Sequence, residues 1–479
     1  MCPELLTAWL VHPSTGLQHA EAELGADCLQ SRLAELGVDS RVELVEDVTP
    51  PPPLPEKSRR DVYEVTEWLA SENFVLRWGA DVDEADAEST LEELEKAWEI
   101  EIVRLAYPEP VGTPTYLMNV YVGSTGGNTP SDLGAAGYYT VDTAGYPMLV
   151  LSADTVADLE GNRATTSAHE FFHAVQHSIG SPYAFGTGEK GAWWWEATAV
   201  WINTRVNPEA SGVGDYLLGW TFFPHLSVDH YQYPDGVLLE GYHAYGAFLF
   251  VDHLGSAEIV RHSWLDADDP DPLVVLDRLL DEEGRSVEEV LVDLWPRVLS
   301  WDLDDGESYA ATHAEWAEEF PAQDQRLGLV LEAGIFGSPD ALCQRYGASY
   351  ARFSPTGEKP DVRLRFDGEL QGSESTAVEW FAQVLVEEDG AFSSYDVPLE
   401  LGEADLLVGE VAEADDIWVV AGALADRKID DEVFEHRIRV DEVRSCGGCD
   451  GGAGGSWLIA VVIGAARSGR RRVPSGDSS

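Results

Sequence analysis

The sequence predicts an α+β protein in which a helix-rich domain precedes a small all-β sandwich. Before about residue 340, apolar residues recur at helical steps of three and four, with several strand-like runs among them. From about Gly347 onward the apolar runs become short and alternating or β-branched, separated by Gly, Asp and Glu, which is typical of a sandwich of about 100 residues. With 479 residues, of which 44% are hydrophobic, the chain is long enough to bury both cores.

Residues 1–60 are expected to form a separate N-terminal region. A weak helical pattern covers residues 20–36, and four successive prolines at 50–53 favour an extended polyproline spacer. The region therefore reads as a propeptide or a linker, and the helix-rich domain is expected to occupy residues 61–340.

The first elements of that domain alternate between strand and helix. Residues 73–78 read as a strand, and three further strand-like runs cover residues 116–122, 137–141 and 148–152. Between the first two, apolar residues at helical spacing predict an amphipathic helix that ends before Pro108. These apolar positions are Leu91, Leu94, Trp98, Ile102 and Leu105.

The later elements are predicted from similar signals. Beyond Gly241 the pattern is helical again, and Ser286 and Glu289 form a capping box ahead of an apolar helix. The sandwich is expected over residues 341–442. Its clearest strand-like runs are 362–366, 384–386, 417–420 and 434–440.

Charge excludes some classes of partner. The chain has 87 Asp and Glu residues against 30 Lys and Arg, a formal net charge of -57. Nucleic-acid phosphates and anionic lipid headgroups would be repelled, so neither is expected to bind this surface.

The motif His169-Glu170-Phe171-Phe172-His173 carries the strongest chemical signal. On a helix, His169 and His173 lie one turn apart and can present both imidazoles to one metal ion. Glu170 points to a neighbouring side, where its carboxylate can reach a water molecule without binding the metal. The alternative is a capping box, since Ser167 stands three positions before Glu170, with histidines that are only structural.

A helix in this segment is supported by its apolar stripe, and Gly180 predicts where it ends. The stripe consists of Ala168, Phe172, Val175 and Ile179. His177 lies one turn beyond His173 and is expected in an outer shell or at the surface.

Glu196 is the best candidate for a third ligand. It is the only acid in an apolar stretch from residue 191 to residue 203, and a buried carboxylate needs a cation or strong hydrogen bonds. A zinc ion would supply that cation. The alternatives are that Glu196 pairs with Arg205 or with the backbone, and that Glu189, in a segment that reads as an exposed loop, is the ligand instead.

These motifs resemble the gluzincin metallopeptidases, which carry HExxH on one helix and a glutamate ligand on the next. More narrowly, the chain looks like a family of zinc metalloproteases of myxobacteria and their relatives. The likeness covers about residues 61–335, and its motifs are 73–78, 169–176, 194–201 and 245–250. One departure concerns the position four after Glu196: it is Val200 and not an acid, so the residue that orients a histidine ligand is not identified.

The resemblance implies a zincin-like metallopeptidase domain that cleaves protein or peptide substrates. His169, His173 and Glu196 would hold Zn²⁺ and Glu170 would be the general base. Tyr245 is favoured, by resemblance, over Tyr242 and His243 as the group that stabilises the oxyanion. The alternative from another class is a cell-surface adhesion or binding protein whose zinc is structural.

The C-terminal residues 443–479 resemble a MYXO-CTERM sorting signal. Cys446 and Cys449 precede an apolar segment at 457–466, and arginines follow from Arg467. The resemblance implies cleavage by a sorting protease, membrane contact only through this tail, and an exported protein at the cell surface or outside the cell. An N-terminal signal peptide is not evident, because no Lys or Arg precedes Arg32.

Overall fold

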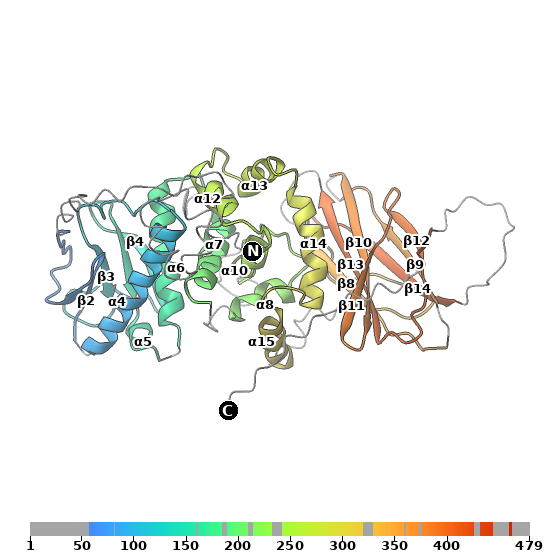
Figure 1. Ribbon diagram of the computed structural model, residues 1–479, viewed down its shortest axis with the longest axis horizontal. Helices are drawn as coiled ribbons and strands as arrows, with labels where there is room; N and C mark the ends of the chain where they lie inside the picture. The colour runs from blue at the N-terminus through green and yellow to red at the C-terminus, as the bar shows by residue number, and fades with distance from the viewer. Residues whose placement is uncertain are drawn as a thin grey trace, which may run out of the picture. The chain divides into compact units, whose positions relative to one another are not determined.

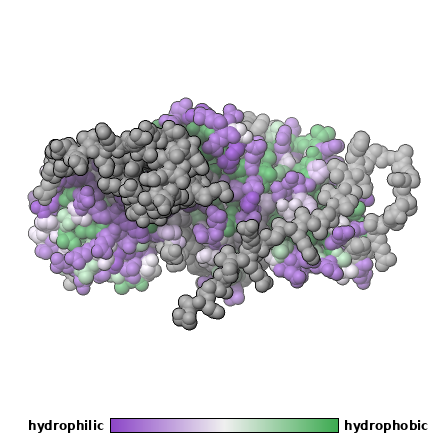
Figure 2. All heavy atoms as spheres, viewed as in Figure 1, coloured by the Kyte–Doolittle hydropathy of each residue, from purple (hydrophilic) through white to green (hydrophobic). Residues whose placement is uncertain are grey.

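The computed structural model describes residues 57–80, 82–159, 161–183, 189–208, 214–231, 242–319, 329–358, 361–372, 376–425, 432–443 and 459–461 (Figure 1). Helices and mixed sheets are both present, as the predicted α+β class requires. The helix expected at 20–36 and the proline spacer lie outside the described residues. Much of the visible face of the described residues is hydrophilic, as expected for a chain of such high charge (Figure 2).

The first sheet has five strands in the order β1-β2-β3-β5-β4. Strands β2, β3 and β5 are parallel, whereas β1 and β4 pair antiparallel at the two edges. Every residue of the three central strands is buried, while β4 is half exposed. The bounds are β1 Glu67–Ala70, β2 Phe74–Trp78, β3 Met118–Val122, β4 Gly137–Val141 and β5 Pro147–Leu151.

Helices α4 (Glu84–Trp98) and α6 (Arg163–Ile179) cover one face of this sheet (Figure 1). The ring of Phe74 on β2 contacts both helices, at 5.8 Å from Trp98 and 5.1 Å from Phe171. The helix expected to run to Leu105 changes pitch after Trp98, because residues Glu99–Arg104 form a π-helical turn. The predicted amphipathic helix is therefore confirmed, but its last turn and a half is wound differently.

Helix α7 (Ala192–Val206) packs against α6 and is buried on almost every side. A layer of shorter helices follows it, and helix α14 begins at the predicted capping box of Ser286 and Glu289. The remaining bounds are α5 Ala153–Val156, η2 Glu189–Gly191, α8 Gly214–Phe222, α10 His243–Gly246, α11 Phe248–His253, α12 Ala257–Leu265, α13 Pro272–Asp281, α14 Val287–Ser300 and α15 Gly306–Glu319.

Two more five-stranded sheets form from residue 329 onward, in the orders β11-β10-β13-β8-β6 and β15-β12-β9-β14-β7. Side chains from both sheets, including Val384 on β10 and Leu364 on β9, belong to one hydrophobic core. The bounds are β6 Leu329–Val330, β7 Phe336–Gly337, β8 Ala348–Phe353, β9 Asp361–Gly368, β10 Val378–Glu388, β11 Ala391–Asp396, β12 Glu403–Val408, β13 Asp416–Ala425, β14 His436–Val443 and β15 Ile459–Val461.

The predicted strands at 362–366, 384–386 and 417–420 fall within β9, β10 and β13, and most of 434–440 falls within β14. Of the C-terminal residues 443–479, the structure describes Val443, which ends β14, and residues 459–461, which pair in parallel with β12. The two cysteines and the arginines of the tail lie outside the described residues. Among the helices that the structure describes, none combines the length and the apolar character needed to cross a membrane.

Candidate metal centre

Helix α6 carries His169, Glu170 and His173, as the sequence predicts. It ends at Gly180, which adopts the left-handed conformation (φ 69°) that glycine accommodates without strain. The helix begins at Arg163, so Ser167 lies inside it and cannot be its N-cap. The capping-box alternative for Ser167 and Glu170 is therefore wrong.

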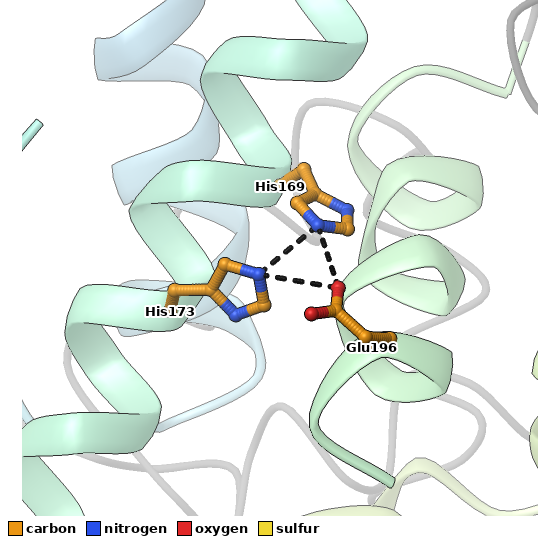
Figure 3. Close-up of side chains that lie close together, drawn as sticks. All are labelled: His169, His173 and Glu196. Carbon is orange, nitrogen blue, oxygen red and sulfur yellow. Dashed lines mark hydrogen bonds and ion pairs between the residues drawn. The ribbon is translucent and has the colours of Figure 1, made fainter. Parts of the chain in front are cut away.

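Three ligand atoms from α6 and α7 converge on one point (Figure 3). The Nε2 atoms of His169 and His173 are 3.0 Å apart. Oε2 of Glu196 lies 3.2 Å from Nε2 of His169 and 3.5 Å from Nε2 of His173. A side-by-side approach of α6 and α7 thus brings together the three residues proposed from the sequence.

The group is buried and fits a cation. The three residues keep only 5–7% of their surface exposed, and Glu196 Oε2 has no hydrogen-bond partner outside the group among the described residues. Arg205 forms its ion pair with Asp252, so the alternative in which Arg205 neutralises Glu196 is wrong. Of the histidines, cysteines and acids that the structure describes, these three form the one group that could hold a metal ion. The side chain of Glu189 lies outside the described part.

The electrostatics of the centre keep the Glu196 carboxylate ionised although it is buried. Burial would raise the pKa of Glu196, but the imidazoles of His173 and His169 outweigh it and hold the pKa at about 2. Burial would lower the pKa of His173, and the Glu196 carboxylate outweighs that effect and raises it. A carboxylate that stays ionised while buried is a strong attractor for a cation.

Glu170 is buried next to the three candidate ligands without belonging to their group. Burial raises its pKa, and the imidazoles of His169 and His173 act in the opposite direction. The backbone N–H of Tyr139 on β4 also lowers the pKa of this carboxylate. Gly137 on the same strand leaves the necessary room, because a Cβ there would come within 3.2 Å of Cγ of Glu170.

Tyr245 lies beside the centre on the short helix α10. Its ring is nearly parallel to that of His169, with centroids 6.1 Å apart, and it stacks on Tyr216 at 5.1 Å. Burial raises its pKa well above the ordinary value. Of the two other candidates, Tyr242 packs against Tyr245 at 5.8 Å, whereas His243 is fully buried and stacks on Trp220.

Sequence reasoning did not find the residues that orient His173. Its Nδ1 lies 2.6 Å from Oε1 of Gln176, and the amide nitrogen of Gln176 donates to Thr198 Oγ1 and to the Trp195 carbonyl, both at 2.9 Å. The sequence did contain one signal for this contact: Gln176 stands three residues after His173, and residues at that spacing are neighbours on a helix. His177 is not part of the group; its exposed ring lies 5.5 Å from that of Tyr139.

Comparisons with known proteins add a family but no activity. No curated protein matches this chain. Among solved structures, a family GH115 4-O-methyl-α-glucuronidase with specificity for decorated arabinogalactans aligns with 8% identity and a TM-score of 0.16, which is too small to indicate a shared fold. That alignment covers 61% of this chain and 39% of the glucuronidase. A family model matches residues 55–425, which include the whole candidate centre, so the chain belongs to the family of unknown function DUF6055.

Proposed function

We propose that this protein is a zinc-dependent metallopeptidase with a zincin-like catalytic domain. The observation that carries the proposal is the convergence of two imidazole nitrogens and one carboxylate oxygen, 3.0–3.5 Å apart, beside a second buried carboxylate that is not a ligand. A structural metal site has no use for that second carboxylate. A hydrolytic site needs it as a base.

The donor set favours zinc. Imidazole nitrogen and carboxylate oxygen are both zinc ligands, and two histidines with one glutamate are the three protein ligands of several catalytic zinc sites. When bound, zinc supplies a Lewis acid with one open position, where it lowers the pKa of water towards about 7. His169, His173 and Glu196 would hold it.

Two side chains act on the substrate in this proposal. Glu170 accepts a proton from the attacking water and passes it to the leaving amine nitrogen as the peptide C–N bond breaks. Tyr245, by its place beside His169, donates its hydroxyl hydrogen to the carbonyl oxygen on which negative charge develops.

The edge of the first sheet supports a peptide substrate. Within the described residues β4 pairs only with β5, so its other edge has free backbone groups. Strand β4 lies beside the centre, because a Cβ at Gly137 would come within 3.2 Å of Cγ of Glu170. An extended peptide that adds to β4 would therefore pass the reacting groups.

Substitution of Glu170 tests this function directly. Glu170→Gln keeps the shape of the side chain and removes the base, so we expect casein cleavage to stop while zinc stays near one per chain. Ser178→Ala is the matched control, because Ser178 lies on the same helix and its hydroxyl bonds to the backbone of Ala174 and Val111, and it should keep full activity. Undiminished cleavage by Glu170→Gln would refute the role of the base. Bound zinc without any chelator-sensitive cleavage by the wild type would favour the adhesion protein instead.

We also propose that the protein is exported and anchored at the cell surface. The tail motif at 443–479 supports processing by a sorting protease and an anchor at the cell surface, where a peptidase would meet extracellular proteins. Mass spectrometry of the surface-exposed protein would show whether the chain ends near Cys446 or Cys449.

A further inference from the structure

We infer that Gln176 is a positioning residue that fixes the tautomer of His173 and ties it to helix α7. The inference rests on the proposed metal site, which it deepens by naming the residue that presents one ligand. Gln176 is completely buried. Its amide lies between the two helices that carry the ligands.

The orientation of the Gln176 amide follows from its neighbours. The Thr198 hydroxyl donates its only hydrogen to the Trp194 carbonyl at 2.7 Å, so its oxygen can only accept from Gln176. The Trp195 carbonyl, also 2.9 Å from the Gln176 nitrogen, can likewise only accept. Both N–H bonds of the amide are therefore directed towards α7, and the amide oxygen faces His173.

The amide oxygen then decides which nitrogen of His173 carries a hydrogen. Because Gln176 Oε1 can only accept, Nδ1 of His173 must donate across the 2.6 Å contact. Nε2 is left to present a lone pair towards Glu196 and His169. The Gln176 carboxamide accepts the hydrogen bond from Nδ1 without carrying a charge. An acid in its place would add a third buried carboxylate beside Glu170 and Glu196.

The same amide couples the imidazole to the third ligand. Trp195, whose carbonyl accepts from Gln176, directly precedes Glu196, and its ring stacks on His173 with centroids 4.8 Å apart. His173 is thus held at its edge by Gln176 and on its face by Trp195. Nδ1 of His169, by contrast, has no hydrogen-bond partner among the described residues.

Zinc affinity of full-length variants tests the inference. In a competition titration with a chromogenic chelator, Gln176→Leu should weaken zinc binding on the order of 10–100-fold, the usual effect of losing an outer-shell partner. Thr198→Val should weaken it less, and Thr198→Ser, which keeps the hydroxyl, should restore wild-type affinity. Ser178→Ala is the matched control: Ser178 is partly buried on the same helix but bonds to Ala174 and Val111, so zinc affinity should not change.

A second measurement uses the wild type alone, in case Gln176→Leu does not fold. Nitrogen-15 NMR of histidine-labelled, metal-free protein, at a pH where His173 is neutral, should show His173 with a hydrogen on Nδ1, protected from exchange with solvent. A hydrogen on Nε2 of His173 would overturn the inference, as would unchanged zinc affinity in Gln176→Leu. A wild type that binds no zinc would instead refute the proposed metal site, so the two failures are distinguishable.

Discussion

His436, at the start of β14, is a neutral histidine buried between two sheets, and its burial should make the protein less stable in acid. Its ring stacks on Phe366 at 5.5 Å and lies 4.9 Å from Trp380. Nε2 shares a 2.8 Å hydrogen bond with the Ser349 hydroxyl. Burial lowers the pKa of His436 from 6.5 to about 4.

The lowered pKa of His436 determines how much the free energy of unfolding changes with pH. Because the unfolded chain takes up a proton near pH 6.5 and the folded chain only near pH 4, the free energy of unfolding falls as the pH drops through this window. With 1.36 kcal/mol per pKa unit, the loss is about 2 kcal/mol at pH 5 and about 3 kcal/mol at pH 4. Above pH 7 the contribution of His436 does not change.

The assay compares the wild type with His436→Gln, whose amide can keep a hydrogen bond to Ser349 but does not titrate. Urea unfolding would be followed by tryptophan fluorescence at pH 7.5, 5 and 4. The difference between the two proteins isolates His436, since the other groups titrate in both. We expect the wild type to lose about 3 kcal/mol relative to the variant by pH 4. A difference that stays constant across this range would refute the reasoning.

Three further predictions concern the helical part of the chain. Free zinc at 100 times its Kd should stabilise the protein by about 2.7 kcal/mol, seen as a higher midpoint in thermal scans and reversed by a chelator. Glu196→Gln should abolish stoichiometric zinc binding in metal analysis, whereas Glu189→Gln should not; the opposite result would make Glu189 the ligand. Trp295→Ala should lower the free energy of unfolding by about 3–5 kcal/mol, measured in urea. The reason is that the Trp295 ring is fully buried, stacks on Trp220 at 5.0 Å and donates a hydrogen bond to the Tyr346 carbonyl. A loss below about 1 kcal/mol would contradict that packing.

The three candidate metal ligands could be predicted because their signals are local. His169 and His173 share a helix face through their spacing alone, and Glu196 stands out as one acid in an apolar stretch. The structure brings these three side chains together. The identity of the metal and the reaction remain predictions, since they depend on what binds there.

Other features could not be predicted because they depend on how separate elements meet. Gln176 orients His173 only because α7 brings the Trp195 carbonyl within reach, and no spacing in the sequence encodes that crossing. The position of β4 at the sheet edge likewise depends on strand order. The π-helical turn after Trp98 could not be predicted for a different reason. The spacing of its apolar residues is also that of an α-helix, so the sequence pattern does not distinguish the two.

The closeness of the three ligands along the chain has a consequence for how the protein folds. All of them come from two consecutive helices, α6 and α7, and fewer than thirty residues separate the first from the last. Closing so short a loop requires little chain entropy compared with pairing the distant strands of the sheets. If the proposed centre binds zinc, the ion would not need the sheets beyond residue 329 in order to bind, and it would help to select the native pairing of α6 with α7 during folding.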